Sequence, residues 1–138
     1  MTITDVMTTD LVLVNPGCTA GEAAQLMRER HIGDVLVVED RRLTGLVTDR
    51  DLAVRVLADG LGPDTPVSRA VTAEPMALTP DAEVQDAVAI MREFAVRRVP
   101  VCDDDGRVLG IVTLGDLAIS EDGSSALADI SEAPPSRV

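Results

Sequence analysis

The chain has 138 residues and a net charge of −12, and its 46% hydrophobic and 26% charged residues are typical of a globular protein. All 12 basic residues are arginine, and Phe94 is the one aromatic residue. An acidic chain repels a polyanion and has almost nothing to stack on bases, so nucleic acid is excluded as a partner. No apolar run approaches the roughly 20 residues of a membrane span, so no membrane partner is expected.

Residues that could carry metal or nucleophile chemistry are few. His31 is the only histidine, and Cys18 and Cys102 lie outside any CxxC or Cys/His pattern, so neither a metal site nor a catalytic residue is predicted. We therefore expect no enzyme activity. Cys102 is predicted in the core, whereas for Cys18 a surface position is favoured over an activated thiol before a helix. The N-terminus lacks the features of a secretory signal, which predicts a cytoplasmic protein.

The first half of the chain predicts a strand, a helix, two strands and a second helix. Residues 11–14 are apolar and end at a turn, as expected of a strand. Thr19 and Glu22 have the spacing of a capping box, and alanines and a methionine at helical spacing follow them. The other predicted elements are strands at residues 35–38 and 43–47 and a helix at residues 50–58.

The second half repeats this plan. Its first helix carries a helical stripe of apolar residues, which are Val84, Ala87, Val88, Met91 and Phe94. Strands are predicted at residues 99–102 and 108–112. The halves align at a shift of 64 residues before the second hairpin and 65 after it, which places one extra residue around 103–106. An insertion confined to a turn indicates two copies of one structural unit.

These alignments predict the domain boundaries. The first repeat is expected at residues 1–58 and the second at residues 67–120, joined by a glycine- and proline-containing linker at residues 59–66. Residues 121–138 are acidic and small, and predict a mostly loose tail with at most one helical turn, at residues 126–130.

A seven-residue motif ends each predicted hairpin. Residues 45–51 read Gly-Leu-Val-Thr-Asp-Arg-Asp, and residues 110–116 read Gly-Ile-Val-Thr-Leu-Gly-Asp. The order predicts a buried strand that turns into a helix, with threonine at the N-cap and aspartate three positions later. Unpaired backbone N–H groups, a hydroxyl and a carboxylate meet there, and such a place can bind a sugar phosphate. The alternative is that both Thr–Asp pairs are capping boxes that need no ligand.

The paired motifs and their matching helices resemble the cystathionine β-synthase (CBS) domain, a regulatory repeat that usually occurs in tandem as a Bateman module. The resemblance covers residues 4–119 and looks like that of small stand-alone bacterial proteins. It implies an α+β fold in which two tandem βαββα repeats pack around a pseudo-two-fold axis. It also implies a homodimer.

The resemblance further implies a non-catalytic sensor of an adenosine-containing ligand in the cleft between the repeats. AMP, ADP, ATP and S-adenosylmethionine all remain open as the ligand, and so does the number of occupied sites. No cofactor is required, and the regulated protein is not identified. The alternative is a CBS-pair interaction protein without a ligand that acts through its dimer surface.

The site residues follow from the resemblance, position by position. Aspartate accepts hydrogen bonds from the ribose hydroxyls and threonine contacts a phosphate, which assigns Asp51 and Asp116 to ribose and Thr48 and Thr113 to phosphate. A carboxylate suits a vicinal diol because it can accept from both hydroxyls together.

Arginines distinguish the two copies. Family members often carry basic residues before the Val-Pro of the middle strand, where this chain has Arg97 and Arg98. The first copy has Gly33 and Asp34 there, and its motif instead contains Arg50. Charge-assisted hydrogen bonds make Arg50, Arg97 and Arg98 the expected phosphate partners, and the alternative for the second pair is a solvated strand end.

Overall fold

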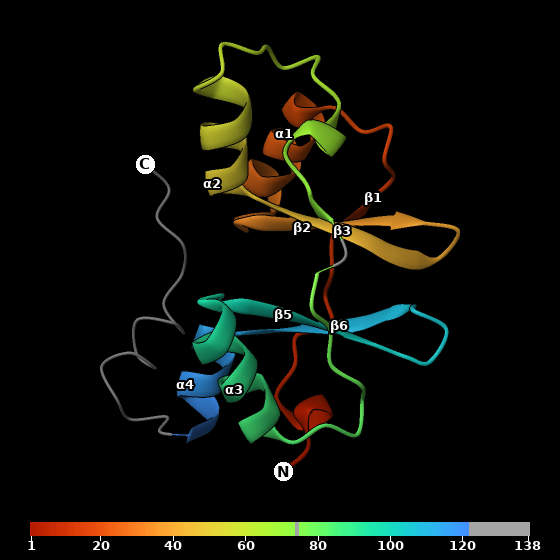
Figure 1. Ribbon diagram of the computed structural model, residues 1–138, viewed down its shortest axis with the longest axis vertical. Helices are drawn as coiled ribbons and strands as arrows, with labels where there is room; N and C mark the ends of the chain where they lie inside the picture. Colours follow the sequence, from red (N-terminus) through yellow and green to blue (C-terminus); the bar gives the residue numbers. More distant parts are fainter. Residues whose placement is uncertain (74, 122–138) are drawn as a thin grey trace. The chain divides into compact units, whose positions relative to one another are not determined.

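The computed structural model describes residues 1–73 and 75–121 (Figure 1). These residues form two compact units, which we describe separately. The first unit is Leu11–Pro75, and the second unit combines Met1–Asp10 with the chain from Met76 onward. The predicted loose tail, with its helical turn at residues 126–130, lies outside the described residues apart from Glu121, which ends a helix.

In the first unit, the described strands form one mixed sheet. Its spatial order is β1 (Leu13–Val14), β2 (Asp34–Glu39), β3 (Arg42–Thr48) and β4 (Thr72–Ala73). β1 runs parallel to β2, whereas β2–β3 and β3–β4 are antiparallel. Asp40 and Arg41 close the β2–β3 hairpin with left-handed φ angles of 51° and 67°, which are typical of a two-residue turn.

The helices of the first unit cover one face of this sheet (Figure 1). They are α1 (Ala20–Arg30), α2 (Asp49–Leu52), its π-helical continuation η2 (Ala53–Leu57) and the 3₁₀ turn η3 (Val67–Arg69). Thr19 caps α1 as predicted, because its hydroxyl accepts the Glu22 N–H at 3.1 Å. The surface position expected for Cys18 is wrong: the side chain is 7% exposed and packs in the core with Ala23 and Met27.

The second unit contains η1 (Ile3–Asp5), α3 (Val84–Phe94), β5 (Arg98–Cys102), β6 (Val108–Thr113) and α4 (Leu114–Glu121). β5 and β6 form an antiparallel hairpin, and Leu78 adds a parallel bridge to Val101 like that of β1 to β2. Cys102 is buried as predicted, and so are three stripe residues of α3. Phe94, the last residue of the stripe and of α3, is 48% exposed and precedes the left-handed residue Ala95.

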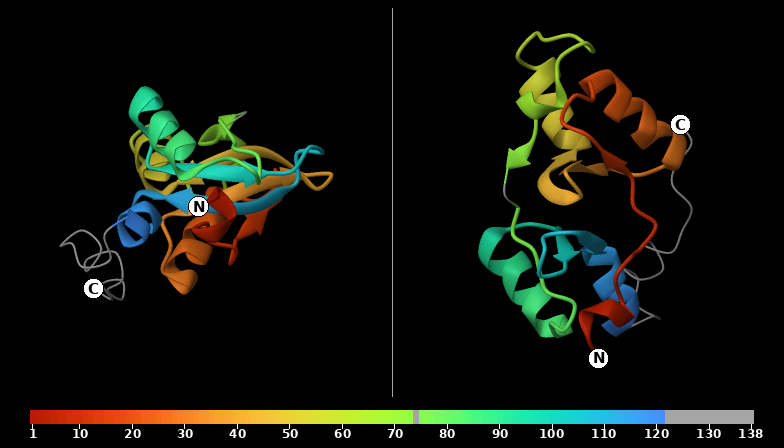
Figure 2. Two further views of the ribbon diagram at one scale, coloured as in Figure 1. Left: turned by 90° about the horizontal axis from the view of Figure 1, so that it is seen from below. Right: turned by 90° about the vertical axis from the view of Figure 1, so that its right-hand side faces the viewer.

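Each unit is completed by a segment that leads into the other repeat, which we call its leading segment. It is Met1–Asp10 in the second unit and residues 67–73 in the first. In the second unit, Thr8 and Ile111 exchange backbone hydrogen bonds of 2.8 and 2.9 Å, and Ile3 is fully buried. Figure 2 shows this N-terminal segment beside α4. In the first unit, β4 pairs with β3 in the same way and Val67 is fully buried. Sequence repeats and spatial units therefore begin at different residues.

The motif glycines lie under these leading segments. A Cβ atom on Gly110 would lie 2.9 Å from the Thr8 carbonyl oxygen and 2.6 Å from Met7 Sδ. A Cβ atom on Gly45 would overlap the Val71 side chain. The motif therefore begins with glycine because another part of the backbone crosses the strand there, and not because the glycine φ angle requires it.

Candidate functional site

The first motif forms a complete capping box where β3 turns into α2. The Thr48 hydroxyl accepts the Asp51 N–H at 3.1 Å, and Asp51 Oδ2 accepts the Thr48 N–H at 2.9 Å. The Asp49 N–H donates to the Gly33 carbonyl at 2.9 Å, which ties the helix start to the beginning of β2. The predicted capping geometry is thus confirmed for this motif, and the role of its residues in ligand binding stays a prediction.

The second motif has the same geometry at the start of α4. The Thr113 hydroxyl accepts the Asp116 N–H at 3.1 Å, and Asp116 Oδ2 accepts the Thr113 N–H at 3.0 Å. The Asp116 carboxylate also accepts the Thr8 hydroxyl, at 3.3 Å from Oδ1 and 3.2 Å from Oδ2. Thr8, in the leading segment of the second unit, therefore donates to this carboxylate from a position where a ligand hydroxyl could also donate.

The predicted basic pair lies beside the second motif. Arg98 is the β5 partner of Thr113, and the Leu114 N–H donates to the Arg97 carbonyl at 2.9 Å. The second unit therefore brings Arg97, Arg98, Thr113 and Asp116 together at one end of its hairpin. In the first unit the corresponding partner of Thr48 is Asp34, so that end of the hairpin carries an acidic residue. Arg50 is exposed in the first turn of α2.

Sequence reasoning missed two residues that contact the motif carboxylates. Arg55 Nε lies 4.0 Å from Asp51 Oδ1, and its Nη1 donates to the carbonyls of Ala70 and Val71 at 3.4 and 3.1 Å. The i, i+4 spacing of Asp51 and Arg55 on a predicted helix was an available signal. No local pattern pointed to Thr8, which is brought to Asp116 by the leading segment.

The two carboxylates keep capacity for further hydrogen bonds. An ionised carboxylate has about four acceptor positions, and the capping bond uses one of them in each motif. Asp51 and Asp116 are both half-buried, so a ligand could reach them. The Asp51 carboxylate already has a guanidinium nearby, whereas the described residues place only hydroxyl and amide donors on Asp116.

The described residues offer little for other chemistry. Burial raises the pKa of the Cys18 and Cys102 thiols, and the negative charges of Glu22 and Asp103, respectively, raise them further. Neither cysteine is therefore an activated thiolate. Within residues 1–73 and 75–121, no group of three or more His, Cys, Asp or Glu side chains could hold a metal ion, and no helix is long and apolar enough to cross a membrane.

Comparison with known proteins identifies relatives of both halves. A family model for the CBS domain matches residues 3–58 and 67–120. The CBS domain-containing protein YhcV of Bacillus subtilis is 41% identical over 133 residues, which cover 94% of each chain. Hypoxic response protein 1 of Mycobacterium tuberculosis is 37% identical over 119 residues, which cover 85% of this chain and 82% of that protein.

Two similar proteins have solved structures with bound species. Hypoxic Response Protein I with two coordinated zinc ions is 37% identical and matches with a TM-score of 0.77, over 86% of this chain and 97% of that one. CBSX2 in complex with AMP is 27% identical and matches with a TM-score of 0.76, over 87% of this chain and 95% of that one. The structural neighbours are CBS-pair proteins, and the α+β fold with two repeats is confirmed.

Proposed function

The chain belongs to the CBS-domain family, and on this premise we propose that it is a non-catalytic regulatory module that binds an adenosine-containing ligand. The observation that carries the proposal is the AMP complex of CBSX2, a CBS protein similar over 87% of this chain. The ligand is one of AMP, ADP, ATP and S-adenosylmethionine. Its binding changes the surface that the module presents to a regulated protein.

We assign the ribose of this ligand to Asp116 in the second unit. The capping bond fixes the carboxylate, and the Thr8 hydroxyl at 3.2 Å occupies a position that a ribose hydroxyl can take. A fixed, half-buried acceptor binds a vicinal diol with little loss of side-chain freedom. Asp51 is the weaker candidate, because the Arg55 guanidinium near its Oδ1 competes for the same oxygen.

We assign the phosphate to the N-terminus of α4, with Thr113, Arg97 and Arg98 around it. Positive charge from two arginines and the positive end of the helix dipole both favour an anion. The first unit offers Thr48 and Arg50 for the same role, but Asp34 lies next to Thr48 and opposes a phosphate. The proposal therefore favours the second unit for the phosphorylated ligand.

A second candidate function rests on the capping boxes. In both motifs the threonine and aspartate bond each other without a ligand, so these residues stabilise the fold whether or not a nucleotide binds. A CBS-pair interaction protein without a ligand would need nothing more from them. Such a protein would act through its dimer surface alone.

Both candidates include a homodimer. Apolar side chains on η2 and α4 are exposed, and Val54, Leu57 and Leu114 have exposed fractions of 48%, 74% and 42%. Apolar surface of this kind is typical of an interface between protein chains. We expect twice the monomer mass in light scattering at micromolar concentration, and a monomer mass would contradict the dimer.

Calorimetric titration of AMP and adenosine distinguishes the two candidates. We expect Arg97→Ala or Arg98→Ala to weaken AMP about ten- to a hundredfold, the equivalent of about 1.5–3 kcal/mol, while adenosine is unaffected. Asp116→Asn should weaken both ligands alike, because the ribose is common to them. The asparagine retains an oxygen that can accept the Thr113 N–H, so the cap is kept.

Arg107→Ala is the matched control, because it removes an exposed arginine at the opposite end of the same hairpin. It should leave both affinities unchanged. Equal losses of AMP and adenosine in the Arg98 variant would remove the phosphate role. If the wild-type protein binds none of the four ligands at millimolar concentration, the interaction protein is the better interpretation.

A further inference from the structure

The two repeats differ at one position beside their motif aspartates. Arg55 and Ser120 each follow the aspartate by four residues, so they occupy equivalent positions on the helix that the motif starts. In the first unit, the Arg55 side chain spans from Asp51 to the leading segment, where it donates to the carbonyls of Ala70 and Val71. The arginine thus joins the helix to the segment that completes the unit.

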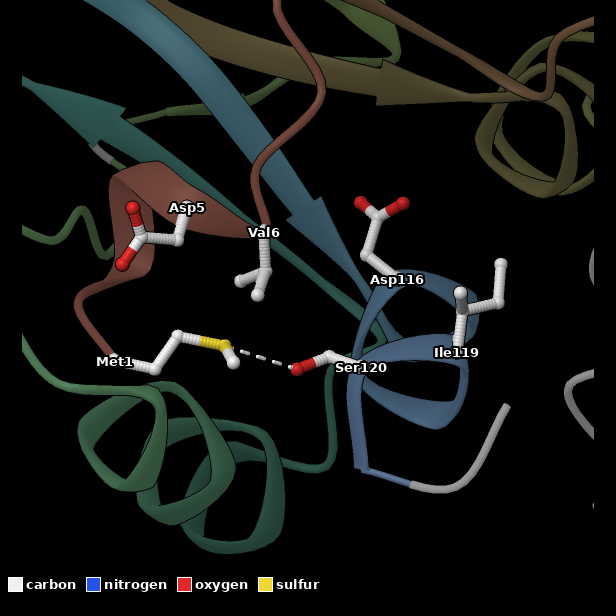
Figure 3. A pocket seen from close by; sticks show the side chains of 6 residues that line it. All are labelled: Met1, Asp5, Val6, Asp116, Ile119 and Ser120. Atoms are coloured by element: carbon white, nitrogen blue, oxygen red, sulfur yellow. Dashed lines mark hydrogen bonds between the residues drawn. The ribbon is translucent and has the colours of Figure 1, made fainter. Parts of the chain in front are cut away.

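The second unit has a hollow where this guanidinium would lie. Ser120 is short, and its hydroxyl lies 3.4 Å from Met1 Sδ. A pocket of about 280 Å³ opens between α4 and the N-terminal segment (Figure 3). Asp116, Ile119 and Ser120 line it from the helix, and Met1, Asp5 and Val6 line it from the segment.

The acceptors that hold Arg55 have counterparts in the N-terminal segment, where Val6 lines the pocket and Met7 follows it. The 64-residue shift places Val6 and Met7 at the positions of Ala70 and Val71. Among the described residues, no backbone or side-chain donor is bonded to the carbonyls of Val6 and Met7. Asp116 Oδ1 is the counterpart of the oxygen near Arg55, and within residues 1–73 and 75–121 its one hydrogen-bond donor is the Thr8 hydroxyl, at 3.3 Å.

The charge of the pocket also favours a cation. Asp5 stands where the first unit has Arg69, and the described lining contains two acidic side chains and no basic side chain. The N-terminal ammonium of Met1, which also lines the pocket, lies 3.9 Å from Glu83 Oε2 and is paired there. Asp5 Oδ2 accepts the Thr2 N–H at 3.0 Å, and Figure 3 shows its carboxylate turned away from α4. Asp116 is therefore the counterpart of Asp51, and no basic side chain of the described lining pairs with it.

We infer that this pocket binds the guanidinium group of a small molecule, which takes the place that Arg55 fills in the first unit. The guanidinium donates to the Val6 and Met7 carbonyls and pairs with Asp116. Its planar set of five donors suits several acceptors at fixed positions better than an ammonium does. The ligand would join α4 to the N-terminal segment and stabilise the second unit.

Agmatine titration followed by ¹H–¹⁵N correlation spectra tests this inference on the full chain. At constant ionic strength, agmatine should shift the amides of residues 6–8 and 119–120 in a saturable way. N-carbamoylputrescine, in which a neutral urea group replaces the guanidinium, is the matched control and should shift none of them. Absence of saturable shifts, or equal shifts with both compounds, would overturn the inference.

Substitutions at positions 55 and 120 give each unit the residue that the other unit has beside its motif aspartate. Ser120→Arg supplies the guanidinium from within the chain, so it should raise the melting temperature and abolish the agmatine shifts, whereas the neutral Ser120→Gln should not raise the melting temperature. Arg55→Ser should create a second agmatine site, with shifts of residues 70–72, and this variant remains informative if Ser120→Arg does not fold. No new shifts in a folded Arg55→Ser variant would contradict the role given to the carbonyls. A guanidinium on Asp116 would compete with the ribose proposed for the same carboxylate, so the two ligands should exclude each other. The titrations contain no nucleotide, so their outcome does not depend on whether AMP binds.

Discussion

Gly110→Ala should destabilise the protein although it adds a single methyl group to a strand. The new Cβ would lie 2.9 Å from the Thr8 carbonyl oxygen and 2.6 Å from Met7 Sδ. The methionine side chain can move aside, but the Thr8 carbonyl is backbone and accepts the Ile111 N–H at 2.9 Å. The leading segment must therefore shift, and overpacking of this kind costs about 1–3 kcal/mol.

The expected loss is measurable by urea unfolding. With a slope of about 2 kcal/mol per molar urea, the midpoint should fall by about 0.5–1.5 M. Hydrogen exchange should locate the change, because the amides of Thr8 and Ile111 form the bonds that the methyl group disturbs. In the variant, the protection of these two amides should fall by more than that of the α1 amides in the first unit.

Gly62→Ala is the matched control. Nothing lies within 4 Å of its Cβ position, and its φ angle is not in the left-handed region. It should leave the protein as stable as before, or more stable by about 0.4–1 kcal/mol, because alanine restricts the unfolded chain. A Gly110→Ala variant within about 0.5 kcal/mol of the wild type would refute the account of the motif glycine.

The contacts of Arg55 and the burial of the two cysteines lead to further predictions. Arg55→Ala should lower the free energy of unfolding by about 1 kcal/mol, because two hydrogen bonds are lost from a side chain that is half exposed. Arg50→Ala should stay within about 0.5 kcal/mol, and equal losses in the two variants would contradict the specific role of Arg55. Burial raises the pKa of Cys18 and Cys102, so at pH 8 both thiols should react with iodoacetamide at least about tenfold more slowly in the folded protein than in urea. The rate should rise as the pH approaches the raised pKa, and mass spectrometry showing equal rates in folded and unfolded protein would contradict the burial.

Local patterns were enough to predict most of the elements. The capping residue Thr19, the alternating and continuous apolar runs of β2, β3, β5 and β6, and the extra residue in the second hairpin all act over a few positions. Each of these features is present in the structure. The motif predicted the capping boxes for the same reason, since their bonds join residues only three positions apart.

Long-range packing explains what the sequence did not predict. Thr8 and Thr72 correspond in the alignment, but nothing local indicates that each pairs with the sheet of the other repeat. β4 has only two residues, which is too short for any periodic signal. Cys18 precedes a helix in a polar stretch, and it is buried because Val67 and Ala70 of the leading segment pack in the same cluster.

The exchange of leading segments also sets an order of assembly during synthesis. The first unit is complete once residue 75 has been made, because all its strands precede that point. Thr8 must wait for Ile111, which at roughly 5–20 residues per second is made about 5–20 s later. During that interval Ile3 and η1 have no sheet to cover them. The N-terminal segment is therefore ordered only after β6 and α4 have been made. Any pause in translation before that point prolongs the exposure of this segment to proteases and to other chains.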